Sequence, residues 1–408
     1  MTTVQIAALI LSLTALLAYV NARFIKLPSQ IGLMAISLAA SLVVVLLDEL
    51  GAIDASDLQR VIAQANFGPT LLHGMLGLLL FAGALHINLR DLREHRWPVA
   101  VLSLGGTVAS TVLVGGTMYL ILGDKLGLAN ALLFGALISP TDPIAVLGVL
   151  KSSRVPPPIE IVIAGESLFN DGVGVVLFTV LLATAGGGHV TAAHVAYLFV
   201  RQALGGAAFG LALGFIGDRM LASIDDYVVE VLITLALVFG GYALAEELAI
   251  SGPIAAVVAG IVIGNHTTDE HFSEKTREHV AMFWQLVDEI LNAVLFLMLG
   301  LEATRLQLSA QLAVAAAIAV PVVLAARLVS VGASAAVLRP FMPKPPHAVK
   351  ILTWGGLRGG LAVALALALP YSNQRDAILV MTYAVVSFAI LVQGLTLPAL
   401  LRKLGLSD

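Results

Sequence analysis

Long apolar stretches separated by short polar breaks follow one another along almost the whole chain. A helix needs about 20 mostly apolar residues to cross the roughly 30 Å hydrocarbon core of a bilayer, and most of these stretches approach or exceed that length. The pattern predicts about thirteen membrane helices, near residues 4–22, 29–47, 69–88, 97–122, 126–150, 158–185, 190–217, 226–247, 251–265, 281–302, 309–338, 347–371 and 376–401. The expected fold is therefore an all-α integral membrane protein.

Composition excludes a water-soluble fold. Of the 408 residues, 59% are hydrophobic and 12% are charged, whereas about a quarter of the residues of soluble domains are charged. The chain has a net charge of −4 and no polybasic or acidic tail, so nucleic acid is not expected as a partner. The chain has no cysteine, which excludes disulfides and thiolate metal sites. We expect no cofactor and no enzyme activity, and we expect the protein to be embedded in a lipid bilayer.

Lysine and arginine gather in alternate segments between the predicted helices. One set of segments holds fifteen of them, and the other holds four, which are Arg60, Lys125, Arg305 and Arg375. Cytoplasmic loops retain basic residues, so the N-terminus is expected outside and the C-terminus in the cytoplasm of a prokaryotic inner membrane. The first apolar run has no preceding positive charge, and we interpret it as a retained helix rather than a cleaved signal.

The helix predicted over 158–185 carries the densest group of polar residues, Glu166 to Gly172. Residues four apart share a helical face, so Ser167 lies with Asp171, and Glu166 with Asn170 on an adjacent stripe. Acids within membrane helices are costly and are functional candidates by default. Oxygen donors on one stripe suit a hard monovalent cation; the alternative is that Asp171 only hydrogen-bonds a neighbouring helix.

The helix predicted over 126–150 is interrupted by Ser139-Pro140-Thr141-Asp142-Pro143. Two prolines remove two backbone donors, which predicts two half-helices with an unwound centre, although a plain proline kink is the alternative. Pro143 then fits the first position of the second half-helix and Asp142 its N-cap, a structural role. The Thr141 carbonyl or hydroxyl is left to face an ion.

The helix predicted over 347–371 has a second interruption, at Gly355 to Gly360, with Arg358 inside it. Interrupted segments at corresponding places in two halves indicate an inverted-repeat transporter with its site at the midplane. The predicted repeats are about 1–185 and 226–404, joined by the helix over 190–217. We expect Glu166 to pair with Arg358, with Asp142, Asp288 and Glu289 as competing acids.

With Glu166 and Asp142 neutralised, Asp171 is the acid left without a fixed counter-charge. Loss of hydration favours its neutral form, so the carboxylate can hold a proton or a cation but not both. Competition at one carboxylate predicts exchange of one cation for one proton, an electroneutral cycle.

These segments resemble the NhaP-type sodium/proton antiporters of the cation:proton antiporter-1 family, which are related to animal sodium/proton exchangers. The segments that carry the resemblance are 139–143, Glu166 to Gly172, 241–265, Gly355 to Gly360 and Val392 to Pro398. The resemblance implies a six-helix core that moves against a dimerisation domain, and a homodimer. It further implies Na⁺ and H⁺ binding at Asp171, with Ser167 and the Thr141 backbone as further ligands and Glu166 paired with Arg358. Asn170 beside Asp171 resembles the electroneutral branch. The expected ion- and proton-binding residues are therefore Asp171, Ser167, Asn170 and Thr141.

One departure from the family pattern bears on the ion. Archaeal members place a glutamate after a phenylalanine in the third helix, whereas Ala82 follows Phe81 here. One fewer acid leaves K⁺, Li⁺ or a broader preference open beside Na⁺. A cation channel is less consistent, because channels usually form rings of carbonyls or acids from repeated subunits, whereas the acids here lie at two broken helices of one chain. An intramembrane hydrolase using Ser167 and Asp171 is also less consistent, because no histidine or lysine lies in those helices to activate a serine.

Several polar residues receive no functional role from the sequence. Asp288 and Glu289 are expected at the start of the helix over 281–302. The histidine-rich segment 266–279 is interpreted as a solvated loop, with a pH-sensing loop as the alternative. Partners for Glu230, Arg201 and Arg327, all within predicted helices, cannot be assigned.

Overall fold

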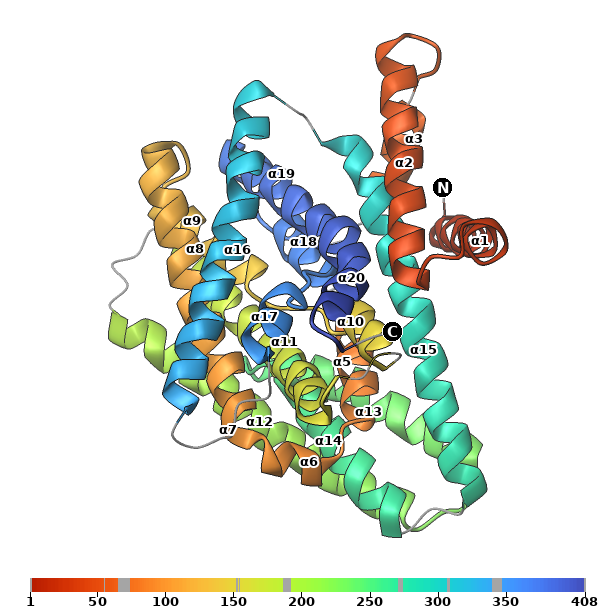
Figure 1. The fold of residues 1–408 in the computed structure, drawn as a ribbon. Coiled ribbons are helices and arrows are strands. Elements are labelled where there is room, and N and C mark those ends of the chain that lie inside the picture. The colour runs from red at the N-terminus through yellow and green to blue at the C-terminus, as the bar shows by residue number, and fades with distance from the viewer. Residues whose placement is uncertain are drawn as a thin grey trace.

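The protein is described here by a computed structural model, which covers residues 2–54, 56–64, 74–151, 153, 155–185, 192–270, 274–306, 309–339 and 347–406. All the regular elements in these ranges are helices (Figure 1). Those of the first half are α1 (Thr3–Val20), η1 (Asn21–Ile25), α2 (Ser29–Glu49), α3 (Ser56–Gln64), α5 (Leu76–Leu85), α6 (Leu89–Glu94), α7 (Arg96–Ala100), η3 (Val101–Gly106), α8 (Thr107–Leu122), η4 (Gly123–Lys125), α9 (Leu128–Ile138), α10 (Ile144–Lys151) and α11 (Pro157–Ala185).

The second half continues the same architecture. Its elements are α12 (Ala192–Leu221), α13 (Tyr227–Glu247), α14 (Gly252–Glu270), α15 (Glu274–Glu302), η5 (Ala303–Arg305), α16 (Ala310–Leu338), α17 (Ala348–Trp354), α18 (Gly360–Leu367), α19 (Asn373–Phe388), η6 (Ala389–Gly394) and α20 (Leu395–Lys403). In the described parts of the chain, 8 helical spans are long and apolar enough to cross a membrane, and α5, α9 and most of α14 are shorter apolar helices. The predicted all-helical, multi-pass membrane fold is confirmed.

Polar side chains mark where several helices begin. Asp226 accepts hydrogen bonds from two amides in the first turn of α13, Ser309 caps α16, and Ser372 caps α19. Each side chain satisfies amides that have no partner within the helix. Helix α8 ends at Leu122, and Gly123 after it has a φ of 56°. This positive φ stops α8 before the next helix starts.

The helices pack in two groups (Figure 1). In one group, α15 packs along α2 and α5, and α14 packs against α5 and α12. In the other, α16 packs against α8 and α19, and α9 packs against α8 and α11. Helix α18 contacts α15 as well as α19, and α11 contacts α12 and α14, so the two groups meet around the interrupted helices.

A row of glycines brings α12 close to α14. Gly206, Gly210 and Gly214 are spaced four residues apart, and a Cβ atom on any of them would lie within 3 Å of atoms of α14 or the residue before it. Lipid tails are as apolar as the helices, so helix association in a bilayer depends on close contact between small residues. The glycine row is therefore what allows these two helices to pack tightly.

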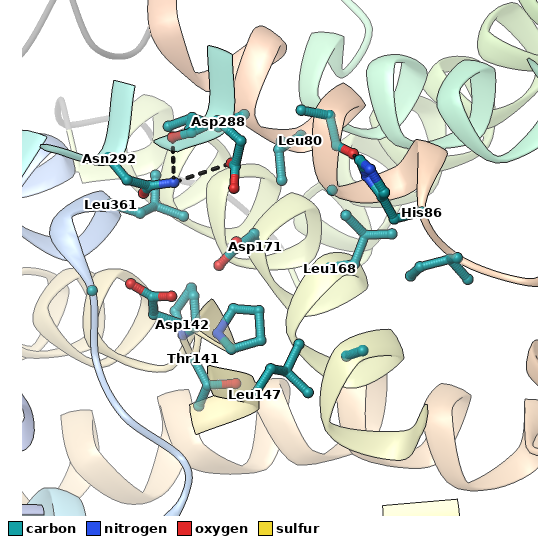
Figure 2. Close-up of a pocket in the computed structure, with 18 of the residues that line it drawn as sticks. Leu80, His86, Thr141, Asp142, Leu147, Leu168, Asp171, Asp288, Asn292 and Leu361 are labelled. Carbon is teal, nitrogen blue, oxygen red and sulfur yellow. Dashed lines mark hydrogen bonds between the residues drawn. The ribbon is translucent and has the colours of Figure 1, made fainter. Parts of the chain in front are cut away.

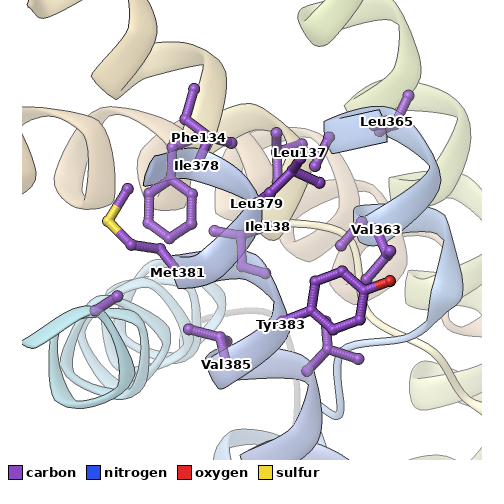
Figure 3. Packing of buried hydrophobic residues seen from close by; sticks show 14 of the residues in the cluster. Phe134, Leu137, Ile138, Val363, Leu365, Ile378, Leu379, Met381, Tyr383 and Val385 are labelled. Carbon is purple, nitrogen blue, oxygen red and sulfur yellow. The ribbon is translucent and has the colours of Figure 1, made fainter. Parts of the chain in front are cut away.

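The apolar halves of the interrupted helices are buried in a common cluster (Figure 3). Phe134, Leu137 and Ile138 of α9 pack with Val363 and Leu365 of α18 and with the buried face of α19. Because these side chains are close to fully buried, the two short half-helices are held by their neighbours rather than by their own length.

Some predicted boundaries require correction. The helix predicted over 281–302 begins at Glu274, and the one predicted over 251–265 continues to Glu270, so the segment 266–279 is largely helical rather than a loop. The short helices α3 and α6 were not expected. Charged residues lower the mean hydropathy of these segments, so the apolar pattern did not predict that they are helical. Part of the helix predicted over 69–88 lies outside the described residues.

Candidate functional site at two crossing helix breaks

Both predicted interruptions are present. Helix α9 ends at Ile138 and α10 begins at Ile144, while α17 ends at Trp354 and α18 begins at Gly360. The Pro143 carbonyl accepts the first helical hydrogen bond of α10, from the Leu147 amide at 2.7 Å. Pro143 thus occupies the N-cap and Asp142 precedes it, one position earlier than predicted.

The two unwound segments are hydrogen-bonded to each other. The Asp142 amide donates to the Leu357 carbonyl at 2.8 Å, and the Arg358 guanidinium donates to the carbonyls of Ser139 and of Pro140, the latter at 2.9 Å. A Cβ atom on Gly359 would overlap the Asp142 side chain, which explains the glycine there. Arg358 supplies positive charge at the C-terminal end of α9, where unpaired carbonyls concentrate negative charge.

The predicted ion pair between Glu166 and Arg358 is wrong. Arg327 of α16 holds Glu166 with two hydrogen bonds, one per carboxylate oxygen, and the second measures 3.0 Å. The same guanidinium donates to the Leu352 carbonyl at 3.0 Å. Leu352 lies in α17, shortly before the second break. Glu166 is 1% exposed and Arg327 is 5% exposed. This buried pair therefore ties α11, α16 and α17 together, while Arg358 serves backbone carbonyls.

Three of the predicted ligands form one hydrogen-bonded cluster. Asn170 uses both atoms of its amide on Thr141: its oxygen accepts from the Thr141 amide at 3.2 Å, and its nitrogen donates to the Thr141 hydroxyl at 2.8 Å. That hydroxyl also lies 3.0 Å from the Ser167 hydroxyl. Ser167 and Asn170 are fully buried, at 2% and 0% exposure. The cluster fixes the unwound segment of Thr141 against α11.

Asp171 faces a cavity of about 710 Å³ rather than this cluster. Figure 2 shows its carboxylate between Asp142 on one side and Asp288 on the other. Within the described part of the chain, no hydrogen bond or ion pair is formed by this carboxylate. Thr141 also contributes to the cavity wall. The site thus combines one free carboxylate with a threonine that is held in place from behind.

Two residues of the site were not predicted from the sequence. Asp288 lies in the middle of α15, because that helix begins earlier than predicted, and it lines the same cavity. Arg327 is the partner of Glu166. The signal for Arg327 was its position inside an apolar helix, where an arginine must meet an acid or carbonyls; nothing in the sequence said which acid.

The unassigned residues Glu230, Arg201 and His279 lie away from this cavity. Glu230 is 0% exposed, and neither of its carboxylate oxygens has a hydrogen-bond partner in the described structure. Arg201 is exposed on α12. In the segment 266–279, His279 stacks on Tyr227 with ring centres 4.9 Å apart, and residues 271–273 lie outside the described ranges. Among the described side chains, Glu230, Arg201 and His279 do not line the cavity that contains Asp171.

Buried charges at two crossing helix breaks, within an all-helical multi-pass membrane protein, define the architecture of a secondary transporter. Comparison with known proteins agrees with this class. The chain belongs to the sodium/hydrogen exchanger family: residues 11–403 match the family described as sodium/hydrogen exchanger, transmembrane.

Relatives and a solved structure resemble the chain over nearly its whole length. It is 48% identical over 410 residues to the Na⁺/H⁺ antiporter NhaP of Pseudomonas aeruginosa, with 98% of this chain and 96% of that protein covered. It is 37% identical to the Na⁺/H⁺ antiporter NhaH of Halobacillus dabanensis, with 94% of each covered. The fold matches the sodium proton antiporter MjNhaP1 from Methanocaldococcus jannaschii with a TM-score of 0.76 at 20% identity, covering 97% of both chains.

Proposed function

We propose that the protein is a secondary antiporter that exchanges one monovalent cation, Na⁺ in the first place, for one proton by competition at Asp171. The observation that carries the proposal is the Asp171 carboxylate, which lines the cavity without a hydrogen-bond or ion-pair partner among the described residues. The relatives named as Na⁺/H⁺ antiporters support the choice of ions. Such exchange would serve sodium transport and pH homeostasis.

The charges at the crossing support an electroneutral cycle. Asp142, Glu166 and Asp171 supply three negative charges, and Arg327 and Arg358 supply two positive ones. With all of them ionised the group carries one net negative charge, which bound Na⁺ or H⁺ neutralises. A net charge buried in the membrane is costly, so the loaded forms are the ones expected to change their access from one side to the other.

We assign different roles to the residues around the cation. Asp171 and Thr141 face the cavity and are proposed to bind it, with the Ser167 hydroxyl adjoining Thr141. Asn170 is reassigned from ligand to support, because both its amide atoms are used on Thr141. Asp142, Glu166 and Arg358 are structural charges at the breaks, as expected from the sequence, and Arg327 joins them.

The wider assembly is part of the same proposal. We infer two inverted repeats, about 1–185 and 226–404, joined by α12, because each half carries one interrupted helix near its end. The N-terminus is proposed to lie outside and the C-terminus in the cytoplasm of the inner membrane, in agreement with the basic segments. The homodimer implied by the family resemblance can be measured from the mass of the purified protein in detergent.

The test is cation-driven proton flux in sealed proteoliposomes with a fluorescent pH reporter. Na⁺, Li⁺ or K⁺ should collapse a preset proton gradient in the wild type and not in Asp171→Asn, and clamping the voltage should leave the rate unchanged. Testing three ions matters because Ala82, where the family pattern has an acid, lines the cavity. Equal flux through the Asn variant would refute competition at Asp171, and flux through the wild type without coupling would indicate a channel.

A further inference from the structure

Asp288 lies across the cavity from Asp171 on a different helix. Asp171 belongs to α11, and Asp288 belongs to α15, which packs along α2 and α5. Both carboxylates line the same cavity, and Figure 2 shows the Asp288 side chain directed towards the space that Asp171 faces. Two acids on separate helices thus approach one volume from opposite walls.

The Asp288 carboxylate is oriented but not neutralised. Asn292, one turn further along α15, donates its side-chain N–H to Asp288 Oδ1 at 3.0 Å and to the Asp288 carbonyl at 2.9 Å. Asn292 is itself 3% exposed, so its position is set by packing. Within the described ranges, the second carboxylate oxygen has no hydrogen-bond donor and no lysine or arginine pairs with it. That oxygen is available to a cation.

The cavity as a whole selects positive charge. The described residues that line it include six acids, Asp91, Asp142, Glu160, Asp171, Asp288 and Glu289, and neither lysine nor arginine. A cleft lined by charges of one sign raises the local concentration of the opposite ion. Glu289 differs from its neighbour because it is exposed and its carboxylate accepts a hydrogen bond from Gln285 at 3.1 Å. The two adjacent acids of α15 can therefore be separated experimentally.

We propose that Asp288 is a second cation-binding carboxylate, which contacts the same monovalent cation as Asp171 while the cavity is open and sets the affinity for it. The inference rests on the proposed antiport function. A monovalent cation that loses part of its water shell needs several oxygen ligands, and Asp171, Thr141 and Asp288 supply them from three separate segments. The exchange remains one cation for one proton, because the Asp288 charge is the same whether the site holds the cation or the proton.

The decisive variant is Asp288→Asn, with Glu289→Gln as the matched control. Asp288→Asn should raise the apparent KM for the cation about tenfold, with little change in the maximal rate and no new voltage dependence. Glu289→Gln should leave the apparent KM within about twofold of the wild type, because that carboxylate is solvated and a solvated charge acts weakly. Raising ionic strength with choline chloride distinguishes a contact from a field effect, since only the field is screened.

Other outcomes would overturn the proposal. Equal shifts in the two variants, or a shift that disappears at high choline chloride, would assign Asp288 to the general field of the cavity. An unchanged KM in Asp288→Asn would remove it from cation binding, while exchange lost only in Asp171→Asn would leave the proposed function standing. If the wild type exchanges no cation, the function itself fails.

A second variant guards against loss of folding. Asp288→Glu keeps the charge and lengthens the side chain, so it should preserve exchange and alter the ranking of Li⁺, Na⁺ and K⁺. An unchanged ranking would contradict direct contact with the ion. Thermal unfolding of the detergent-purified protein provides a readout without transport, because a ligand that binds only the folded state raises stability. Na⁺ should stabilise the wild type more than Asp288→Asn.

Discussion

At the scale of single residues, the buried charges of the crossing divide into those with fixed partners and one without. Glu166 is bound by Arg327, and Arg358 is bound by the carbonyls of Ser139 and Pro140. Asp171 has no such partner among the described residues. A buried charge that is permanently paired can hold helices together, whereas one that lacks a partner is a candidate for binding a mobile ion or a proton.

The ion pair of Glu166 and Arg327 can be tested by removing one partner at a time. Glu166→Gln should destabilise the protein by about 3–5 kcal/mol, because it leaves the Arg327 guanidinium buried without a counter-charge. The double variant Glu166→Gln with Arg327→Met should recover part of that loss. Thermal unfolding in detergent measures both; a Glu166→Gln variant as stable as the wild type would show that the pair is not what holds these helices.

At the scale of elements, close contact between helix backbones positions the site. Glycines on α12 meet α14, and Gly174 of α11 lies where a Cβ atom would overlap Pro140 in the first break. The half-helices α9 and α18 are too short to be stable alone, and they depend on these contacts and on the cluster around Phe134. The breaks are therefore held in place by packing against neighbouring helices.

Substitution within the glycine row tests whether the close packing of α12 against α14 stabilises the protein. Gly210→Leu should destabilise the protein by about 2 kcal/mol or more, because its Cβ would lie 2.5 Å from the Ala255 carbonyl oxygen. Gly240→Leu on α13 is the control, since a Cβ there meets nothing within 4 Å. Unfolding temperatures of the two purified variants give the comparison, and equal losses would mean that α12 and α14 do not depend on the glycine.

At the scale of the whole molecule, the cavity leads from Asp171 towards one end of the helix bundle. Its wall includes Asn88 and Asp91, beside the basic residues of α6, and Glu160 near the start of α11. The basic residues of this end are the ones that the positive-inside rule assigns to the cytoplasm. The described conformation thus corresponds to access from the cytoplasmic side under the proposed orientation.

The absence of cysteine makes this orientation directly measurable. In Gly148→Cys, a cavity-lining position, a membrane-impermeant maleimide should react only after the cytoplasmic side is opened. In Asp124→Cys, an exposed position at the far end of α8, it should react with intact cells. Labelling in the reverse order would invert the proposed topology without affecting the fold.

The sequence by itself determined the long apolar helices, the two breaks and the polar stripe of α11. Each follows from rules that act within one segment: apolar length for a membrane span, proline and glycine for an interruption, and residue spacing for a helical face. The charged first part of α15 is also a local feature, because helix propensity, unlike apolar length, extends the predicted helix beyond its apolar part. The choice of Asp171 as the carboxylate to bind the ion likewise came from the sequence, and it stays a prediction.

Only the tertiary structure decided which charges meet. Arg327 and Arg358 were equally available to Glu166, and their separation along the chain carries no information on how α11, α16 and the second break are placed relative to one another. The same holds for Asp288, which joins Asp171 because α15 and α11 face one cavity. Contacts between helices depend on crossing geometry and on small-residue packing across the whole bundle, and no local pattern records that geometry.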